Sequence, residues 1–184
     1  MKRFKTLAVL PVMAVLCVAC GKSDVAPLPA ASDPDVKAPA VAATPVPFAV
    51  FELPDLADAA TARCSIDKVN TQKSRGQVVN VDAASEVRFV GWVSDAAKQV
   101  PAQFTIVLSG PATYGVAATA GGKRPDVARV MKAKTLENSG FNVLATLGAV
   151  TAGEYAVSII EDTAGKVAQC VTTTRVVVSA GAPG

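Results

Sequence analysis

The sequence predicts an all-β fold, a two-sheet sandwich with one short helical crossover, over residues 51–179. Apolar residues alternate with polar ones in several short runs, and the strongest run puts Val87, Phe89 and Val93 on one face. Turn residues separate these runs at short intervals, as is typical of all-β sandwiches. The stretch of about 130 residues is long enough to bury a core of its own.

The elements follow in order along this stretch, beginning with a short helical turn at residues 54–60. Strands are predicted at residues 64–69, 77–81, 87–93, 104–108, 113–118, 141–147, 155–160 and 170–178. Turns that contain glycine, proline, aspartate or serine separate them at residues 109–111, 121–122, 138–140 and 162–165. In the strand at 87–93 the face opposite the apolar one carries Arg88, Val90 and Trp92.

Residues 124–131 interrupt the β pattern and predict a short helix that covers one end of the sandwich. Pro125 suits the first helical position, and Asp126 suits the positive end of the helix. Two lysines suit its negative end, Lys132 and Lys134. Three apolar residues share one face at i, i+3 and i+4, namely Val127, Val130 and Met131.

The N-terminal residues have the features of a targeting signal. A basic start precedes an apolar run at residues 7–19, which is too short to span a bilayer and suits a signal peptide. Ala19 and Cys20 end this run in a pattern that resembles the lipobox of bacterial lipoproteins. The resemblance implies that Cys20 is lipidated and becomes the N-terminus, and Gly21 in place of aspartate favours the outer membrane. The alternative is an ordinary secretory signal cut after Ala19.

Four regions follow from this assignment: a signal peptide (1–19), a Pro/Ala tether (20–50), the sandwich (51–179) and a short tail (180–184). Residues 21–50 contain six prolines and eight alanines, a composition that predicts an extended spacer without a packed core. The signal holds three of the 18 basic residues and none of the 15 acidic ones, so the remaining chain has no net charge. A nucleic-acid partner is therefore not expected.

Cys64 and Cys170 are the two cysteines of the predicted domain, one near its start and one in its last strand. Outside the cytoplasm they are expected to form a disulfide with a structural role. The alternative, a redox pair, is disfavoured because the sequence has no Cys-x-x-Cys motif. The bridge would close a long loop and restrict the unfolded chain.

The sequence gives little support for catalysis, because it contains no histidine. Histidine is the commonest general base and the commonest metal ligand. The neighbouring carboxylates Asp55/Asp58 and Glu161/Asp162 are expected to be solvated surface pairs. No catalytic residue, metal site or cofactor is predicted.

A few residues have both a structural and a binding interpretation. Trp92 and Tyr155 are expected in the core or at a corner of the sandwich, with carbohydrate stacking as the alternative. The basic residues around the predicted helix are expected to form a solvated face, with a patch for anionic lipid or polysaccharide as the alternative. They are Lys123, Arg124, Arg129, Lys132 and Lys134.

Five short motifs occur in an order that resembles small immunoglobulin-like domains appended to bacterial glycosyltransferases and other envelope polysaccharide proteins. They are Gly91-Trp92-Val93-Ser94-Asp95, Tyr114, Arg124-Pro125-Asp126-Val127, Gly140-Phe141 and Gly153-Glu154-Tyr155. The resemblance covers about residues 64–179 and implies an immunoglobulin-like sandwich that binds rather than catalyses. The family would make Tyr155 a tyrosine corner. The chain departs from the family in its cysteine pair and in having no enzymatic domain.

The sequence thus favours a non-catalytic lipoprotein of the bacterial cell envelope, anchored by lipid on the periplasmic side or at the cell surface. Its expected role is a binding or structural module for an envelope protein or a glycan. One alternative is an inhibitor or exclusion factor that blocks a hydrolase or a phage protein through a surface loop. An enzyme is the remaining alternative, disfavoured by the lack of histidine.

Overall fold

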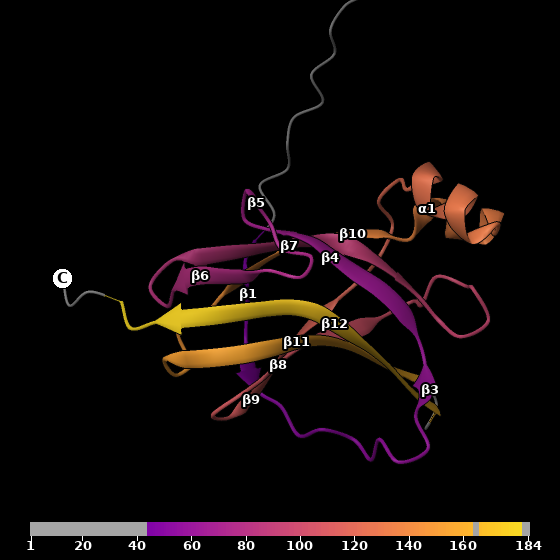
Figure 1. The fold of residues 1–184 in the computed structure, drawn as a ribbon. Helices are drawn as coiled ribbons and strands as arrows, with labels where there is room; N and C mark the ends of the chain where they lie inside the picture. The colour runs from indigo at the N-terminus through magenta and orange to yellow at the C-terminus, as the bar shows by residue number, and fades with distance from the viewer. Residues whose placement is uncertain (1–43, 164–165, 182–184) are drawn as a thin grey trace, which may run out of the picture. The chain divides into compact units, whose positions relative to one another are not determined.

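The structure, a computed structural model, describes residues 44–163 and 166–181. Strands make up most of the described residues and form two sheets, with one short α-helix and one 3-10 helix (Figure 1). The predicted all-β sandwich with a short helical crossover is therefore confirmed. Cys20 and the predicted signal peptide lie outside the described residues, as does the predicted tether up to residue 43.

The first sheet has five strands in the spatial order β1-β10-β7-β4-β5. Their bounds are β1 Val46–Pro47, β10 Gly140–Thr146, β7 Glu86–Ser94, β4 Arg63–Val69 and β5 Gln72–Lys73. Neighbours in this sheet are antiparallel except for β1 and β10, which are parallel. The pairing of β4 with β7 shifts register between Ile66 and Lys68, so Asp67 has no cross-strand partner there.

The second sheet runs β2-β9-β8-β11-β12-β3, and β6 pairs with another part of β12. The bounds are β2 Ala49–Val50, β9 Thr113–Ala118, β8 Phe104–Ser109, β11 Gly153–Thr163, β12 Lys166–Ser179, β3 Ala60–Thr61 and β6 Val78–Asp82. Strands β3 and β6 both run parallel to β12, and the other neighbours are antiparallel.

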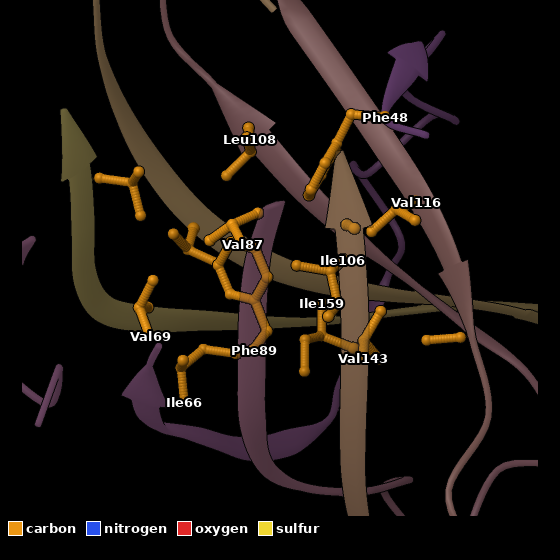
Figure 2. Close-up of a cluster of buried hydrophobic side chains, with 14 of the residues drawn as sticks. Phe48, Ile66, Val69, Val87, Phe89, Ile106, Leu108, Val116, Val143 and Ile159 are labelled. Carbon is orange, nitrogen blue, oxygen red and sulfur yellow. The ribbon is translucent and has the colours of Figure 1, made fainter. Parts of the chain in front are cut away.

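The core lies between the two sheets and follows the predicted alternation. On β7, Val87, Phe89 and Val93 are fully buried against residues of both sheets. Figure 2 shows Val87 and Phe89 within this core. Gly91 occupies the same face because a side chain there would overlap the Ser65 carbonyl oxygen and the Phe141 ring. The opposite face of β7, with Arg88, Val90 and Trp92, is only partly buried, as the period of two requires.

The helix α1 (Pro125–Met131) lies on the outer side of the first sheet, with Pro125 at its start as predicted (Figure 1). It leads into the 3-10 helix η1 (Lys134–Asn138). The predicted apolar face is partly wrong, because Val130 is 76% exposed and Ala128 is buried beside Val127 instead. We call the group under these helices the Trp92 cluster; it consists of Val127, Ala128 and Leu136 with Trp92, Val100, Met131 and Ala133 packed against them.

The domain begins earlier than the sequence predicted. The sequence predicts that residues 46–50 belong to the tether, yet β1 and β2 join both sheets and Phe48 between them is 1% exposed. The Phe48 ring packs edge-on against Phe89, with 5.9 Å between ring centroids. Proline is tolerated in such short edge strands, so a proline-rich composition did not exclude pairing here.

The helical turn predicted at residues 54–60 is not present. The chain instead makes a short turn in which the Asp55 carboxylate accepts a hydrogen bond from the Ala57 amide at 2.9 Å. Aspartate often forms this local side-chain bond, which competes with helix formation.

Glu161 is buried, whereas the sequence predicts a solvated surface pair of Glu161 and Asp162. Its residue is 4% exposed, and one carboxyl oxygen has no hydrogen-bond partner among the described residues. On β11 it follows the inward alternation of Tyr155, Val157 and Ile159, which carries it into the sandwich. Burial, together with the nearby charge of Asp95, raises the pKa of Glu161 to about 7.

Two predicted structural features are confirmed. Cys64 of β4 and Cys170 of β12 form a disulfide, with their Cα atoms 6.0 Å apart, and join the two sheets. Tyr155 is fully buried and its hydroxyl donates a hydrogen bond to the carbonyl oxygen of Thr151 at 2.8 Å. This bond to the backbone four residues upstream is the geometry of a tyrosine corner.

Candidate functional site

A groove of about 530 Å³ lies between α1 and the start of β4. It combines an aromatic side chain, an apolar helix edge, three arginines, two carboxylates and the disulfide. The residues that line it are Ala62, Arg63, Cys64, Asp67, Arg75, Trp92, Arg124, Asp126, Val127, Val130, Met131 and Cys170. An aromatic ring and charged groups of both signs therefore line the same groove.

Trp92 reaches this groove because β7 alternates. Its neighbours Gly91 and Val93 face the core, so the indole projects from the outer face of the first sheet. There the Trp92 cluster covers part of the ring, and the remainder borders the groove. Of the core or corner position expected for Trp92, the structure shows a partly buried position in the smaller Trp92 cluster, on the face of β7 opposite the main core.

Arg124 fixes the position of α1 relative to β4. It precedes Pro125, and its guanidinium donates two hydrogen bonds to the Asp126 carboxylate at 3.0 and 2.9 Å. A third bond, 2.8 Å long, goes to the carboxylate of Asp67 on β4. Arg124 thus ties the loop before α1 to β4, and the forked guanidinium is suited to such a double contact.

The Asp126 carboxylate pairs with Arg124 and does not cap the helix. It lies in the first turn of α1, but no side-chain bond caps this helix start. Its carboxylate instead receives hydrogen bonds from Arg124, which is the main reason that the pKa of Asp126 falls to about 2. The same pair raises the pKa of Arg124. Both groups therefore stay charged over the whole physiological range.

The two remaining arginines of the groove carry charges that no acidic residue in the described part of the chain pairs with. Among the described residues, neither Arg63 nor Arg75 takes part in an ion pair. The Arg63 guanidinium approaches only the Met131 sulfur, at 3.9 Å. Both side chains are exposed and are free to bind a ligand.

A second hollow of about 640 Å³ adjoins the groove along β4 and β5. Asp67 and Arg75 line both hollows, so the two are adjacent at these residues. The second hollow adds Lys68, Lys73 and Gln77.

The basic residues singled out in the sequence do not form one face. Arg124 points toward the groove, whereas Arg129, Lys132 and Lys134 line a separate hollow of about 270 Å³ on another side of α1. The left-handed conformation of Lys132 ends α1 and turns the chain toward η1. Lys123 borders yet another hollow, which residues of β7 and β10 also line.

The sequence analysis did not single out Arg63, Asp67 and Arg75 of the groove, nor Lys68 and Lys73 of the adjoining hollow. One usable signal was Trp92 itself, which the alternation of β7 placed opposite the core residues. An aromatic residue on an outward face indicates a covered patch or a ligand site. Here α1 and η1 cover part of Trp92, and the remainder borders the groove. Arg63 and Arg75 had no comparable signal, since isolated surface arginines are common.

Neither a metal site nor a membrane-spanning helix is found in the part of the chain that the structure describes. No group of three acidic or cysteine side chains there is placed to hold a metal ion. No helix there has the length and apolar character needed to cross a bilayer. Comparison of the chain with protein-family models, curated proteins and solved structures finds no match in any of the three.

Proposed function

We propose that this chain is a non-catalytic binding module of the bacterial envelope, lipid-anchored through Cys20, whose groove at Trp92 binds a glycan. The lipobox-like end of the signal supports the anchor, and the predicted tether would hold the domain away from the membrane. The resemblance to immunoglobulin-like domains of polysaccharide proteins supports a glycan partner.

The exposed part of the Trp92 indole is the observation that carries this proposal. A sugar ring has an apolar face that stacks on an aromatic side chain and polar edges that need hydrogen bonds. The groove offers both, since Trp92, Arg63 and Arg75 line it together. Its volume of about 530 Å³ is in the range of ligand sites in proteins.

The electrostatics of the groove favour binding over hydrolysis. A glycosidase of the usual kind needs one carboxyl group with a raised pKa to act as the acid. In this groove the pKa of Asp126 is lowered to about 2, and Asp67 accepts hydrogen bonds from both Ser65 and Arg124. Such carboxylates are suited to orient Arg124 rather than to transfer protons.

Fluorescence of Trp92 tests the glycan proposal directly, because it is the sole tryptophan of the chain. The full chain, purified in detergent, would be titrated with neutral and acidic oligosaccharides. We expect a saturable change in emission with at least one of them. In a calorimetric titration, Trp92→Phe should retain part of the glycan affinity and Trp92→Ala should lose it. Val90→Ala, on the same face of β7, is the matched control and should bind normally. Binding that persists in Trp92→Ala would refute the groove as the site.

Lipidation is tested separately. Cys20→Ser should abolish labelling by a fatty-acid probe and release the protein from the membrane fraction. A wild-type chain that takes no label, with a variant that stays membrane-bound, would contradict the anchor.

A second candidate function, an inhibitor acting through a surface loop, is favoured by the loop between β7 and β8. Asp95 and Gln99 bond to each other through their backbones at 2.9 Å, and the Asp95 carboxylate accepts a bond from the Gln99 amide at 2.6 Å. Lys98, which is exposed, is held to η1 by a hydrogen bond from Thr135. A braced, exposed loop of this kind loses little entropy when it binds a target. Capture of a foreign hydrolase, abolished by Lys98→Asp and unaffected by Trp92→Ala, would support this candidate over the glycan.

A further inference from the structure

The hairpin of β4 and β5 places two lysines directly opposite each other. Lys68 and Lys73 are cross-strand partners, and both side chains are exposed. Like charges at opposite positions of an antiparallel pair destabilise it. No ion pair among the described residues includes either lysine, so this repulsion is not offset by an acidic side chain there.

The hairpin holds this arrangement firmly. The Asn70 amide donates to the Arg88 carbonyl at 2.7 Å, and the Asn70 side chain accepts a hydrogen bond from the Arg88 amide at 2.8 Å. Asn70 also takes the positive φ of 54° that the turn needs, which asparagine tolerates well. Because the register is fixed, the two lysines cannot separate by slipping along the strands.

Arg63 and Arg75 extend the same unneutralised charge to the groove at Trp92. Arg75 lines both hollows, and the span along β4 from Arg63 to Lys68 is about 17 Å. The one carboxylate shared by the two hollows, Asp67, is already bonded to Ser65 and Arg124. We call the resulting basic surface the track. It has the Trp92 ring at one end, Arg63 and Arg75 along its length, and Lys68 and Lys73 at the other end.

We infer that this track binds an acidic polysaccharide, with one sugar ring at Trp92 and carboxylates of later sugars at Arg75 and the Lys68/Lys73 pair. This inference rests on the proposed glycan function and adds the charge and the extended form of the ligand. Carboxylates accept charge-assisted hydrogen bonds from lysine and arginine and offset the repulsion of the lysine pair. A neutral glycan would occupy the groove and leave that repulsion unchanged.

The test compares oligogalacturonate with the same oligosaccharide after reduction of its carboxyl groups, using the full chain in detergent. The wild type should bind the acidic form at least about tenfold more tightly, and added salt should weaken that binding. The double variant Lys68→Gln/Lys73→Gln should lose about tenfold or more in affinity for the acidic form and none for the reduced form. Its melting temperature should stay equal or rise, because the repulsion is removed.

Arg129→Gln/Lys132→Gln is the matched control, since it removes two positive charges from another side of α1. An equal loss of affinity in this control would mean that net charge and not the track attracts the ligand, which would overturn the inference. Trp92-dependent binding of both forms with equal affinity would overturn it while leaving the glycan function standing. If neither form binds, and other oligosaccharides also fail, both proposals are wrong. Preferential binding of single-stranded DNA would also overturn it.

Discussion

The main core and the Trp92 cluster lie on opposite faces of one strand and are built in different ways. On the inner face of β7, Val87, Phe89 and Val93 are fully buried between two sheets. On the outer face, Trp92 is only partly buried beneath α1 and η1. The inner face is closed by strands from both sheets, whereas the outer face is covered by two short helices.

Because of this difference, the residues that stabilise the fold and the residue that borders the groove lie on opposite faces of the nine-residue strand β7. A closed core gains most from burial and tolerates little change, because cavities are costly. A half-covered patch gains less from burial but leaves an aromatic surface in contact with a groove. Substitutions on the two faces should therefore have different effects, and the following predictions test that separation.

The largest effect is expected in the core. Phe89→Ala should lower the free energy of unfolding by about 3–5 kcal/mol, since the side chain is fully buried and packs against Phe48. Trp92→Ala should cost only about 1–2 kcal/mol, because part of its ring is already exposed. Urea denaturation of both variants measures the difference. Equal losses would mean that the Trp92 cluster is part of the main core.

The disulfide connects the two regions, since Cys64 and Cys170 line the groove and join the sheets behind it. Replacing both cysteines with alanine should cost about 2–5 kcal/mol, because the bridge spans 106 residues and restricts the unfolded chain. Denaturation with and without reductant measures this loss. A wild type whose stability does not change on reduction would contradict the prediction.

Glu161 gives the core a dependence on pH. Its pKa is raised from 4.5 to about 7, so the native state holds a proton that the unfolded state has already released between these values. Stability should therefore fall as pH rises from about 4.5 to 7, by at most about 3 kcal/mol, and then remain constant. In Glu161→Gln this fall should disappear, so the variant should be the more stable protein at pH 8. Denaturation across this range checks it, and parallel curves for the two proteins would show that Glu161 is not buried.

The period of two predicted the long strands well because burial on one face of a sheet imposes it. Strand β9 agrees with the prediction to the residue, and the alternation of β7 is correct along its length. The short strands could not be predicted in this way, because two residues carry no period. Phe48 belongs to the core only because β1 and β2 pair with distant strands, a contact that local sequence does not encode.

The candidate site was harder to predict than the fold for a similar reason. Arg63, Arg75 and Trp92 meet through pairing between β4 and β7 and through the placement of α1, all of which are tertiary. Arg124 ties α1 to β4 through Asp67, which lies 57 residues away in the sequence, so no local pattern indicates the contact. The disulfide was predictable because two cysteines in one domain allow only one pairing.

The smallest effect concerns the ion pair that holds α1 over the groove. Asp126→Ala should lower stability by no more than about 1 kcal/mol, because its side chain is 56% exposed and solvent screens the pair. The pKa of Asp126 is lowered to about 2, so its contribution is present above about pH 4 and is lost as pH falls toward 2. The difference between wild type and Asp126→Ala should accordingly vanish near pH 2, which thermal denaturation at both pH values measures.

The same variant also distinguishes a structural role from a binding role. In Asp126→Ala, Arg124 keeps its bond to Asp67, so α1 stays anchored to β4 and glycan affinity should change little. Arg124→Gln loses both carboxylate contacts and leaves Asp67 and Asp126 without their cation, so it should be the less stable variant and should bind weakly. Charge reversal at Arg129, Lys132 and Lys134, which line another hollow, should leave both melting and glycan binding unchanged. Loss of glycan binding in that triple variant, with melting preserved, would move the site from the groove to the far side of α1.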